Sequence, residues 1–318
     1  MQDKANNIDQ NKRRAWAANR CLMEASRERA GPCGYRSGRN ARLAGLALRV
    51  GGVALKSIGL FQRGCDNAFN LAFRQMDLLL PSLDEALDGY GILHLSDLHL
   101  DGMDELAERI IALLPTEPVD LCVITGDFGL GADSWDSRTL KSLAGIIESI
   151  SSRDGIIGVL GNHDSASMVP ALESIGIRML INESMQIERG PGQMTLIGTD
   201  DVHFYYTPAA VEALGKACEG FSIALVHSPE LYAEACEAGV DLYLCGHTHG
   251  GQVCLPGGKG IVRNLCRGQR FYKGHWHHGR MQGVTHCGVG TSGLPIRFNS
   301  RGELLYLRLR CRQSQHRS

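Results

Sequence analysis

The chain has 318 residues, enough for one large α/β domain with an appendage or for two small domains. Apolar residues make up 43% and charged residues 21%, which is ordinary for a soluble globular protein. The most apolar early stretch, residues 43–60, is interrupted by Arg49 and Lys56 and is shorter than the ~20 apolar residues that span a bilayer. These features exclude a transmembrane span in this stretch and predict a soluble or peripheral protein.

Charge is distributed unevenly along the chain. The formal net charge is −1, but residues 1–50 contain eleven Lys/Arg and only four Asp/Glu. Residues 1–40 are polar, basic and rich in Asn, Arg and Gly, which predicts a disordered arm. A basic arm on a mildly acidic body is compatible with an anionic membrane surface, with nucleic acid or with a simple solvated tail.

Residues 41–89 form a second N-terminal segment with a different pattern. Apolar and basic residues follow a helical rhythm from about residue 41 to residue 80, and an acidic connector comes next. One interpretation is an amphipathic element that lies on an anionic membrane through residues 42–74. The other is a helical collar packed on the following domain, and the pattern slightly favours it.

The chain has eleven cysteines, an odd number, and no Cys-x-x-Cys pair. Cys122 and Cys245 lie inside apolar strand candidates, so the cysteines are interpreted as reduced residues that act as small apolar side chains. No apolar segment follows the first basic residues, as a signal peptide would require. The expected localisation is the cytoplasm, with peripheral binding to the inner face of the membrane as a further option.

Residues 90–310 show the pattern of one α/β domain. In the first half we expect strands at 91–96, 120–125 and 155–160 and helices at about 104–114, 140–150 and 168–175. The second half has expected strands at 177–187, 194–198, 221–226 and 240–245 and helices at 208–218 and 229–238. It ends with a glycine-rich region, short strands near 283–289 and 295–298, a strand at 304–309 and a basic tail at 311–318. The alternation predicts βαβ units and a largely parallel or mixed sheet.

Five of the expected strands end in side chains that can bind metals. These residues are Asp97, His99, Asp127, Asn162, His163, His227, His247 and His249. Ligands of α/β sheets bind outside the carboxyl ends of the strands, so the side chains are expected to face one crevice. Imidazole suits Zn, Fe and Mn, and with carboxylate and amide oxygens the set matches two divalent transition metals. It is too rich in nitrogen for Ca²⁺ and too poor in thiolate for a structural zinc site.

A glycine precedes three of these ligands, at Gly126, Gly161 and Gly246. Glycine tolerates positive φ and lets backbone segments approach closely, as loops around metals require. One such glycine would be ordinary in a loop, but three favour a built site. His247 and His249 follow an apolar strand two residues apart, so on a continued strand both imidazoles would share one face.

The order of these motifs resembles that of the calcineurin-like metallophosphoesterase family, and the resemblance covers roughly residues 91–310. The five signatures are Asp97-Leu98-His99, Gly126-Asp127, Gly161-Asn162-His163-Asp164, His227 and Gly246-His247-Thr248-His249. Two further segments, Gly250-Gly251-Gln252 and Asp201-Val202-His203-Phe204, resemble the bacterial membrane-associated phosphodiesterase-like branch. The resemblance implies an α/β fold, namely a four-layer αββα sandwich with two mixed β-sheets flanked by helices.

The resemblance also implies a role for each motif residue. Two divalent cations (Mn, Fe or Zn) would be held by Asp97, His99 and His249 on one side and by Asn162, His227 and His247 on the other. Asp127 would bridge the two metals, and a metal-bridging hydroxide would be the nucleophile. His163 would be the catalytic residue that assists the leaving group or stabilises the transition state.

Residues beside the motifs have several interpretations. Asp201 and His203 are interpreted as substrate-binding residues, with a packing role equally open for His203. Asp164 is interpreted as a helix N-cap rather than a catalytic group. The histidines of residues 275–278 are expected on a surface loop, with the lining of a substrate entrance as the alternative.

The leading hypothesis is a dinuclear metal-dependent phosphoesterase that hydrolyses phosphodiester or pyrophosphate-linked substrates, either small molecules or lipid-linked ones. A nuclease acting on DNA or RNA is the enzyme alternative. It is disfavoured because the arm has only Trp16 and Tyr35 as aromatic residues that could stack on bases. A non-catalytic scaffold is the remaining alternative, and the complete set of ligands counts against it.

Overall fold

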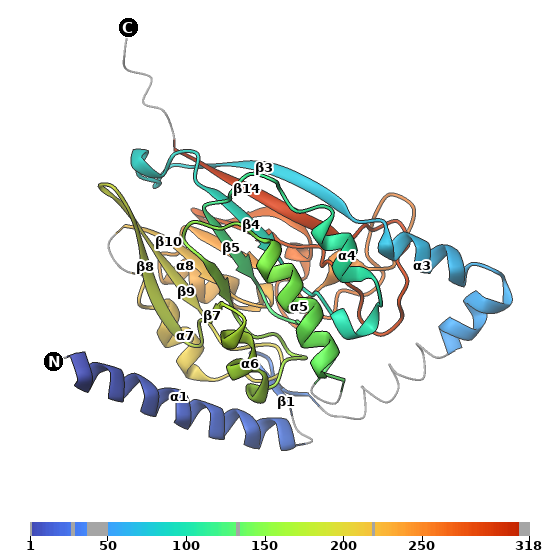
Figure 1. Cartoon of the computed structure of the whole chain (residues 1–318), viewed down its shortest axis with the longest axis horizontal. Helices are drawn as coiled ribbons and strands as arrows, with labels where there is room; N and C mark the ends of the chain where they lie inside the picture. The colour runs from blue at the N-terminus through green and yellow to red at the C-terminus, as the bar shows by residue number, and fades with distance from the viewer. Residues whose placement is uncertain (1, 27–28, 37–49, 132–133, 218–219, 312–318) are drawn as a thin grey trace, which may run out of the picture.

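The computed structural model describes residues 2–26, 29–36, 50–131, 134–217 and 220–311. The stretch 37–49 and, from residue 312 on, the predicted basic tail at 311–318 lie outside the described residues. Two six-stranded sheets lie face to face, with helices on their outer faces (Figure 1). This arrangement confirms the predicted α/β fold with two mixed sheets.

The first sheet has the order β3-β14-β4-β5-β6-β7. Its strands are β3 (Ala72–Leu80), β14 (Glu303–Cys311), β4 (Gly91–Leu95), β5 (Leu121–Ile124), β6 (Ile156–Gly158) and β7 (Ile177–Met179). Neighbouring strands from β4 to β7 are parallel, and β14 is antiparallel to β4 but parallel to β3. The carboxyl ends of β4, β5 and β6 therefore meet at one edge of the sheet.

The second sheet has the order β12-β13-β11-β10-β9-β8. Its strands are β12 (Gly274–His278), β13 (Met281–Thr285), β11 (Leu242–Cys245), β10 (Phe221–Leu225), β9 (Gly192–Gly198) and β8 (Glu183–Arg189). The four inner strands are parallel, and antiparallel edge strands flank them. The predicted surface loop at 275–278 is wrong, because these residues form β12 against β13. Conversely, no strand forms at 295–298 beyond a single bridge from Phe298 to Val253.

Three apolar cores separate the four layers. The central core joins the sheets, with Ile92 and Leu121 facing Ile223 and Leu244. The two outer cores place helices on the sheets: α4 (Leu106–Ile111), α5 (Ser137–Ser149) and α6 (Val169–Ser174) on the first, α7 (Pro208–Leu214) and α8 (Tyr232–Glu237) on the second. Leu93, next to Ile92, belongs to an outer core because successive strand residues point to opposite faces.

Short 3₁₀ helices connect several of these elements. They are η1 (Glu85–Leu87), η2 (Leu100–Gly102), η3 (Ala166–Met168), η4 (Pro229–Leu231), η5 (His249–Gly251) and η6 (Gln269–Phe271). Four of them, η2, η3, η4 and η5, begin within a few residues of a predicted metal ligand, so these ligands are carried by tight turns rather than by open loops.

The prediction of disorder for residues 1–40 is wrong for most of the arm. Residues Gln2–Ala25 form the long helix α1, and β1 (Arg29–Gly31) pairs with β2 (Gly34–Arg36). In Figure 1, α1 runs along the side of the domain beside α6. Arg13 anchors it through Glu183 (2.8 Å) and Glu173. The prediction fails because these partners lie 160 and more residues away in sequence.

The helical prediction for residues 41–80 is correct only in part. Residues 50–57 and α3 (Phe61–Phe69) are helical, but the nine residues of β3 pair in register with β14. Leu78 and Leu80 enter the central core, while Leu79 between them is 56% exposed. That alternation has period two, the strand period, and the helical interpretation does not account for it. Among the described helices, none is long and apolar enough to cross a bilayer.

Candidate metal centre

The predicted ligands lie in loops that leave the carboxyl ends of five strands from both sheets. Asp97, Asp127 and Asn162 follow β4, β5 and β6 of the first sheet, and His227 and His247 follow β10 and β11 of the second. The two sheets face each other, so these strand ends deliver their side chains to a common place. Six of the seven predicted ligands form two buried groups of three, and Asn162 contacts the second group.

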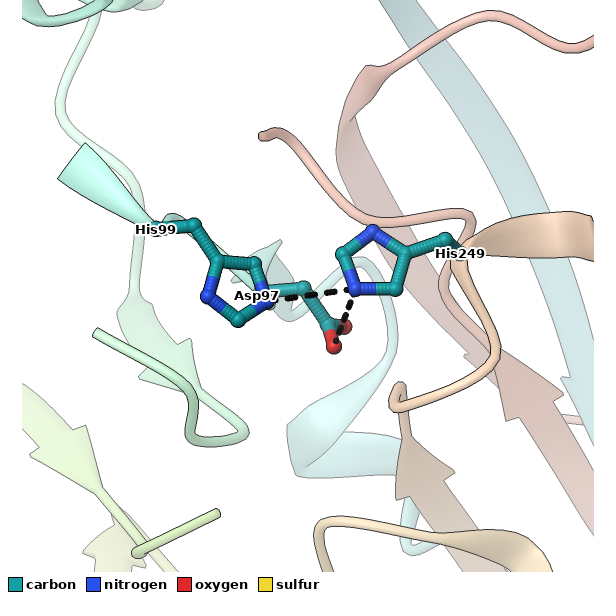
Figure 2. A group of neighbouring side chains, drawn as sticks. All are labelled: Asp97, His99 and His249. Atoms are coloured by element: carbon teal, nitrogen blue, oxygen red, sulfur yellow. Dashed lines mark hydrogen bonds and ion pairs between the residues drawn. The ribbon is translucent and has the colours of Figure 1, made fainter. Parts of the chain in front are cut away.

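The first group consists of Asp97, His99 and His249, which face one another in Figure 2. Nε2 of His249 lies 3.2 Å from Nε2 of His99 and 3.4 Å from Oδ1 of Asp97. The other ring nitrogen, Nδ1, contacts the carbonyl oxygen of Gly129 in His99 (2.9 Å) and of Gly290 in His249 (3.4 Å). Because a carbonyl oxygen only accepts, each Nδ1 carries the hydrogen, and each Nε2 directs a lone pair into the group.

The second group consists of Asp127, His227 and His247. Nε2 of His227 lies 3.3 Å from Oδ2 of Asp127, 3.2 Å from Oδ1 of Asn162 and 3.2 Å from Nδ1 of His247. Nδ1 of His227 donates to the Thr125 carbonyl (2.7 Å). In His247 the two ring nitrogens have the opposite roles: Nε2 donates to the Asn264 carbonyl (3.0 Å), so Nδ1 faces the group.

Asp127 lies between the two groups. Its Oδ2 is 3.3 Å from Nε2 of His227 and 3.6 Å from Nε2 of His99. Burial raises the pKa of the Asp127 carboxyl group, but His227, His163 and His99 outweigh burial and hold that pKa well below its usual range. Asp127 is thus a charged carboxylate within reach of two sites, as the predicted bridging role requires.

The donor set fits two divalent cations. In each group two imidazole nitrogens approach to 3.2 Å, and in all four rings the opposite nitrogen is bonded to a backbone carbonyl. In the first group both facing nitrogens carry lone pairs, which repel at that distance unless a cation lies between them. Burial lowers the pKa of His99 to about 4 and those of His247 and His249 well below normal, which keeps these three rings neutral and able to bind metal. Burial also acts to lower the pKa of His227, but Asp127 outweighs it and raises that pKa well above normal, so a cation at the second group would replace the proton of this ring.

The backbone of the centre is compact and strained. A Cβ at Gly246 would lie 1.9 Å from Oγ of Ser96, and one at Gly161 would lie 2.1 Å from Oδ1 of Asp127, so the predicted need for close approach is confirmed. Five ligands have positive φ between 42° and 74°: Asp97, His99, Asp127, His247 and His249. Non-glycine residues in this region cost about 1–3 kcal/mol each and cluster at functional sites. The strand expected to carry His247 and His249 ends earlier, at Cys245, and the two rings enter different groups.

His163 lies beside the first group but is not part of either one. Its ring packs edge-on against His99 with centroids 5.2 Å apart, and its Nδ1 contacts the carbonyl oxygen of Leu130 (2.7 Å). Its backbone N–H donates to Oδ1 of Asp127 (2.9 Å). The side chain is half-buried, so its Nε2 can meet a substrate, and its catalytic role stays a prediction.

The N-cap interpretation of Asp164 is wrong, because Ser165 caps the following turn. The Asp164 carboxylate instead accepts hydrogen bonds from the backbone N–H groups of Asp127 (2.8 Å), Phe128 (2.9 Å) and Gly161 (2.7 Å). It thereby ties the loop after β6 to the loop after β5. Burial, together with the neighbouring charge of Asp127, raises the pKa of Asp164 to about 7.

Asp201 and His203 are buried beside the second group. The Asp201 carboxylate accepts from the backbone N–H groups of His203 (3.0 Å) and Phe204 (2.8 Å) and shapes its own loop. The His203 ring lies 4.0 Å from the His247 ring, between centroids, and its Nδ1 contacts Glu230 (2.9 Å). These contacts orient His247, and the proposed contact of both residues with substrate stays a prediction.

Two buried arginines near the centre were not identified from the sequence. Arg297 donates to the carbonyl oxygens of His249 (3.2 Å), Cys287 (2.9 Å) and Gly290 (2.6 Å). Arg20, on α1, donates to the carbonyl oxygens of Asp164 (2.8 Å) and Gly161 (3.3 Å). No sequence motif marks either one, because each binds backbone atoms distant in sequence.

Two buried Asp/His groups, with Asp127 close to a histidine of each, are consistent with a dinuclear metal site in an α/β sandwich. Residues 90–251 match the family described as Calcineurin-like phosphoesterase, and the chain belongs to this family. The Uncharacterized metallophosphoesterase YkoQ of Bacillus subtilis is 30% identical over 68% of this chain and 82% of the relative.

One further relative and one solved structure are also similar to this chain. The Phosphodiesterase YaeI of Escherichia coli is 28% identical over 69% of this chain and 82% of its own length. The crystal structure of Phosphopantetheinyl Hydrolase (PptH) from Mycobacterium tuberculosis covers 63% of this chain and 89% of that chain, with 12% identity and a TM-score of 0.40.

Proposed function

We propose that this chain is a dinuclear metal-dependent phosphoesterase that hydrolyses phosphodiester or pyrophosphate-linked substrates. The observation that carries the proposal is the convergence of imidazole nitrogens and carboxylates in two buried groups, with Asp127 within reach of both. One relative carries the name phosphodiesterase, which supports a diester over a monoester. When bound, two divalent cations supply Lewis-acid polarisation of the phosphoryl group and activation of water.

The residues around the centre would have three roles: holding the cations, transferring a proton and positioning the loops. The seven predicted ligands would hold the cations, and the backbone carbonyls behind the histidines fix each ring. His163, oriented by its bond to the Leu130 carbonyl, would hold or deliver a proton at Nε2 toward the leaving oxygen. Asp164 holds the loop that carries Asn162 and His163 against Asp127.

Hydrolysis of bis-p-nitrophenyl phosphate by the full chain, with Mn²⁺ and then with excess chelator, tests the proposal. We expect turnover with Mn²⁺ and loss of turnover on chelation. The variant His163→Ala is expected to keep two Mn²⁺ per chain but to lose about 10²–10⁴-fold in kcat. Absence of turnover with Mn²⁺, Fe²⁺ and Zn²⁺ alike, on diesters and pyrophosphates, would refute the function.

We also propose that the segment around residues 50–74 contacts an anionic membrane surface, where a lipid-linked substrate would be met. Val50, Val53 and Ile58 each expose more than 60% of their surface. Beside α3, a cavity of about 450 Å³ is lined by four cationic side chains: Arg63, Arg74, Lys273 and Arg301. Exposed apolar residues next to clustered cations are the features of a surface that binds anionic lipid.

Flotation with phosphatidylglycerol vesicles tests this second proposal, with phosphatidylcholine vesicles as the control lipid. We expect the full chain to float only with the anionic vesicles, and the double variant Arg63→Glu/Lys273→Glu to remain at the bottom. Arg138→Glu, a reversal at an exposed site on α5, is the matched control and should float like the wild type. Equal flotation of all three proteins would contradict the assignment.

A further inference from the structure

The loop of residues 161–166 is held from two directions. On one side the Asp164 carboxylate ties it to the backbone of Asp127 and Phe128. On the other side it meets α1, where Arg20 donates to two of its carbonyl oxygens, those of Gly161 and Asp164. Asn162 and His163 lie between these two carbonyls. Their position therefore depends on contacts that come from an N-terminal helix outside the residues that match the family.

Arg20 is itself firmly fixed. Its side chain is fully buried and forms ion pairs with Asp200 and with Glu24 (3.0 Å). Its guanidinium carbon lies 3.5 Å from the centre of the Tyr205 ring, a cation–π contact. Trp16, one turn earlier on α1, donates from Nε1 to the second oxygen of Asp200 (2.7 Å).

Glu24 extends the contact along the same loop. One oxygen accepts from the backbone N–H of Ala166 (2.9 Å), and the other accepts from the hydroxyl of Ser165 (2.8 Å). Arg20 and Glu24, one turn apart on α1, thus bind four polar positions of the loop that ends at η3. An apolar face would attach α1 to the domain equally well. The charged pair of Arg20 and Glu24 therefore also fixes the position of the loop that it binds.

From these contacts we infer that Arg20 is a positioning residue for the reaction. It sets the place of the Asn162 amide oxygen and of the His163 ring through the carbonyl oxygens of Gly161 and Asp164. Displacement of a catalytic group by about 1 Å can cost 10²-fold in rate, and loss of a group that orients a metal ligand costs about 10–100-fold in affinity. Helix α1 is accordingly part of the working active site. This inference rests on the proposed function.

The test compares Arg20→Met with Arg13→Ala in the full chain. Methionine keeps the apolar bulk of the stem but makes no hydrogen bond to the loop. Arg13, on the same helix, is bonded to Glu173 and Glu183 away from the metal ligands, so it reports on loosening of α1 alone. The measurements are kcat and KM for bis-p-nitrophenyl phosphate, and calorimetric titration of each metal-free protein with Mn²⁺.

For Arg20→Met we expect kcat to fall at least about tenfold, KM to stay within about twofold, and the weaker of the two Mn²⁺ sites to lose about tenfold in affinity. Arg20→Lys should recover part of kcat, since its ammonium group can reach one carbonyl. Arg13→Ala should match the wild type within about twofold in all three quantities. Wild-type kcat and Mn²⁺ affinity in a folded Arg20→Met would overturn the inference.

Two further outcomes remain decisive. If circular dichroism shows that Arg20→Met does not fold, Glu24→Gln replaces it. This change weakens the bonds to Ser165 and Ala166 without burying an unpaired charge, and kcat should fall about threefold, whereas an unchanged kcat refutes the inference. If the wild type hydrolyses none of the substrates, the proposed function fails, and the Mn²⁺ affinity of the variants alone decides the role of Arg20.

Discussion

Arg297 and Arg20 perform the same task in two different surroundings. Both side chains are buried, and both donate to backbone carbonyl oxygens of loops that carry metal ligands. Arg297 lies in the segment before β14 and binds the turns around His249 and Gly290. Arg20 lies on α1, more than 130 residues before the loop that it binds.

The two sites differ in how the charge is balanced. Within the described residues Arg297 forms no ion pair, and burial lowers its pKa. Burial acts on Arg20 in the same direction, but Asp200 and Asp201 outweigh it and raise the pKa of the guanidinium group. Arg297 is thus held by direct bonds to carbonyl oxygens, with the charges of Asp97 and Glu303 acting from further away, whereas Arg20 on the docked helix forms direct ion pairs with carboxylates. Removing a side chain that holds the ligand loops from inside the domain, such as Arg297, should lower the free energy of unfolding more than removing one of the contacts of helix α1. Four variants test this ranking.

The largest effect is expected for Arg297→Met. The substitution removes a charged donor from the carbonyl oxygens of His249, Cys287 and Gly290, and a hydrogen bond to a charged group contributes about 1.5–3 kcal/mol. The His249 and Gly290 carbonyls keep a second donor, so the losses are not expected to add in full. We expect the free energy of unfolding in urea to fall by about 3–5 kcal/mol. Arg297→Lys should lose less of the free energy of unfolding. A loss below about 1 kcal/mol for Arg297→Met would contradict the expectation that Arg297 contributes more to stability than the contacts of α1.

A smaller effect is expected for Asp164→Asn, on the opposite side of the loop that Arg20 binds. Three backbone N–H groups now donate to the two carboxylate oxygens of Asp164, but asparagine has only one acceptor oxygen. Its amide N–H₂ would face one of these N–H donors. The free energy of unfolding of the metal-free protein should fall by about 2 kcal/mol. Stability equal to the wild type would show that Arg20 alone holds the loop.

The next effect concerns Asp200→Asn, which removes one counter-ion of Arg20 and keeps the side-chain shape. Glu24 still neutralises the guanidinium group, and the amide oxygen still accepts from Trp16. We expect a loss of about 1.5 kcal/mol in urea unfolding, the value of a hydrogen bond to a charged group. A loss as large as that of Arg297→Met would mean that docking is not the weaker attachment.

The smallest effect is expected for Arg13→Ala. Its ion pairs with Glu173 and Glu183 are about one-third exposed, and such pairs contribute about 0–1 kcal/mol. The melting temperature should shift by no more than about 3 °C. A larger shift would place the main attachment of α1 at its middle rather than at Arg20.

The sequence predicts the features that local pattern determines. Ligand side chains directly follow apolar strands, and parallel strands bring their carboxyl ends together, so Asp97, Asp127, Asn162 and His227 can be grouped from the order of residues alone. The close approach at Gly161 and Gly246 is predictable too, because only glycine leaves room there. The family's motif order supplies the division of the ligands between two sites.

Other features depend on partners that are distant in sequence. The Asn264 carbonyl decides that His247 presents Nδ1 rather than Nε2, and no pattern around His247 reports it. The helical prediction fails over β3 because the partner of this strand, β14, comes more than 220 residues later. The docking of α1 escapes prediction for the same reason, since a polar helix gives no apolar stripe and Arg20 finds its acceptors only in the folded domain.

The place of β14 in the first sheet has a consequence for biosynthesis. This strand fills the space between β3 and β4, yet it is the last of the described strands in the order of synthesis. At about 5–20 residues per second, the nascent chain spends about 10–40 s with β4 made and its neighbour missing. Throughout that interval two strand edges stay open to other polypeptides. Synthesis of β14 is thus the event that seals this sheet, and a product truncated before this strand would leave the facing edges of β3 and β4 exposed.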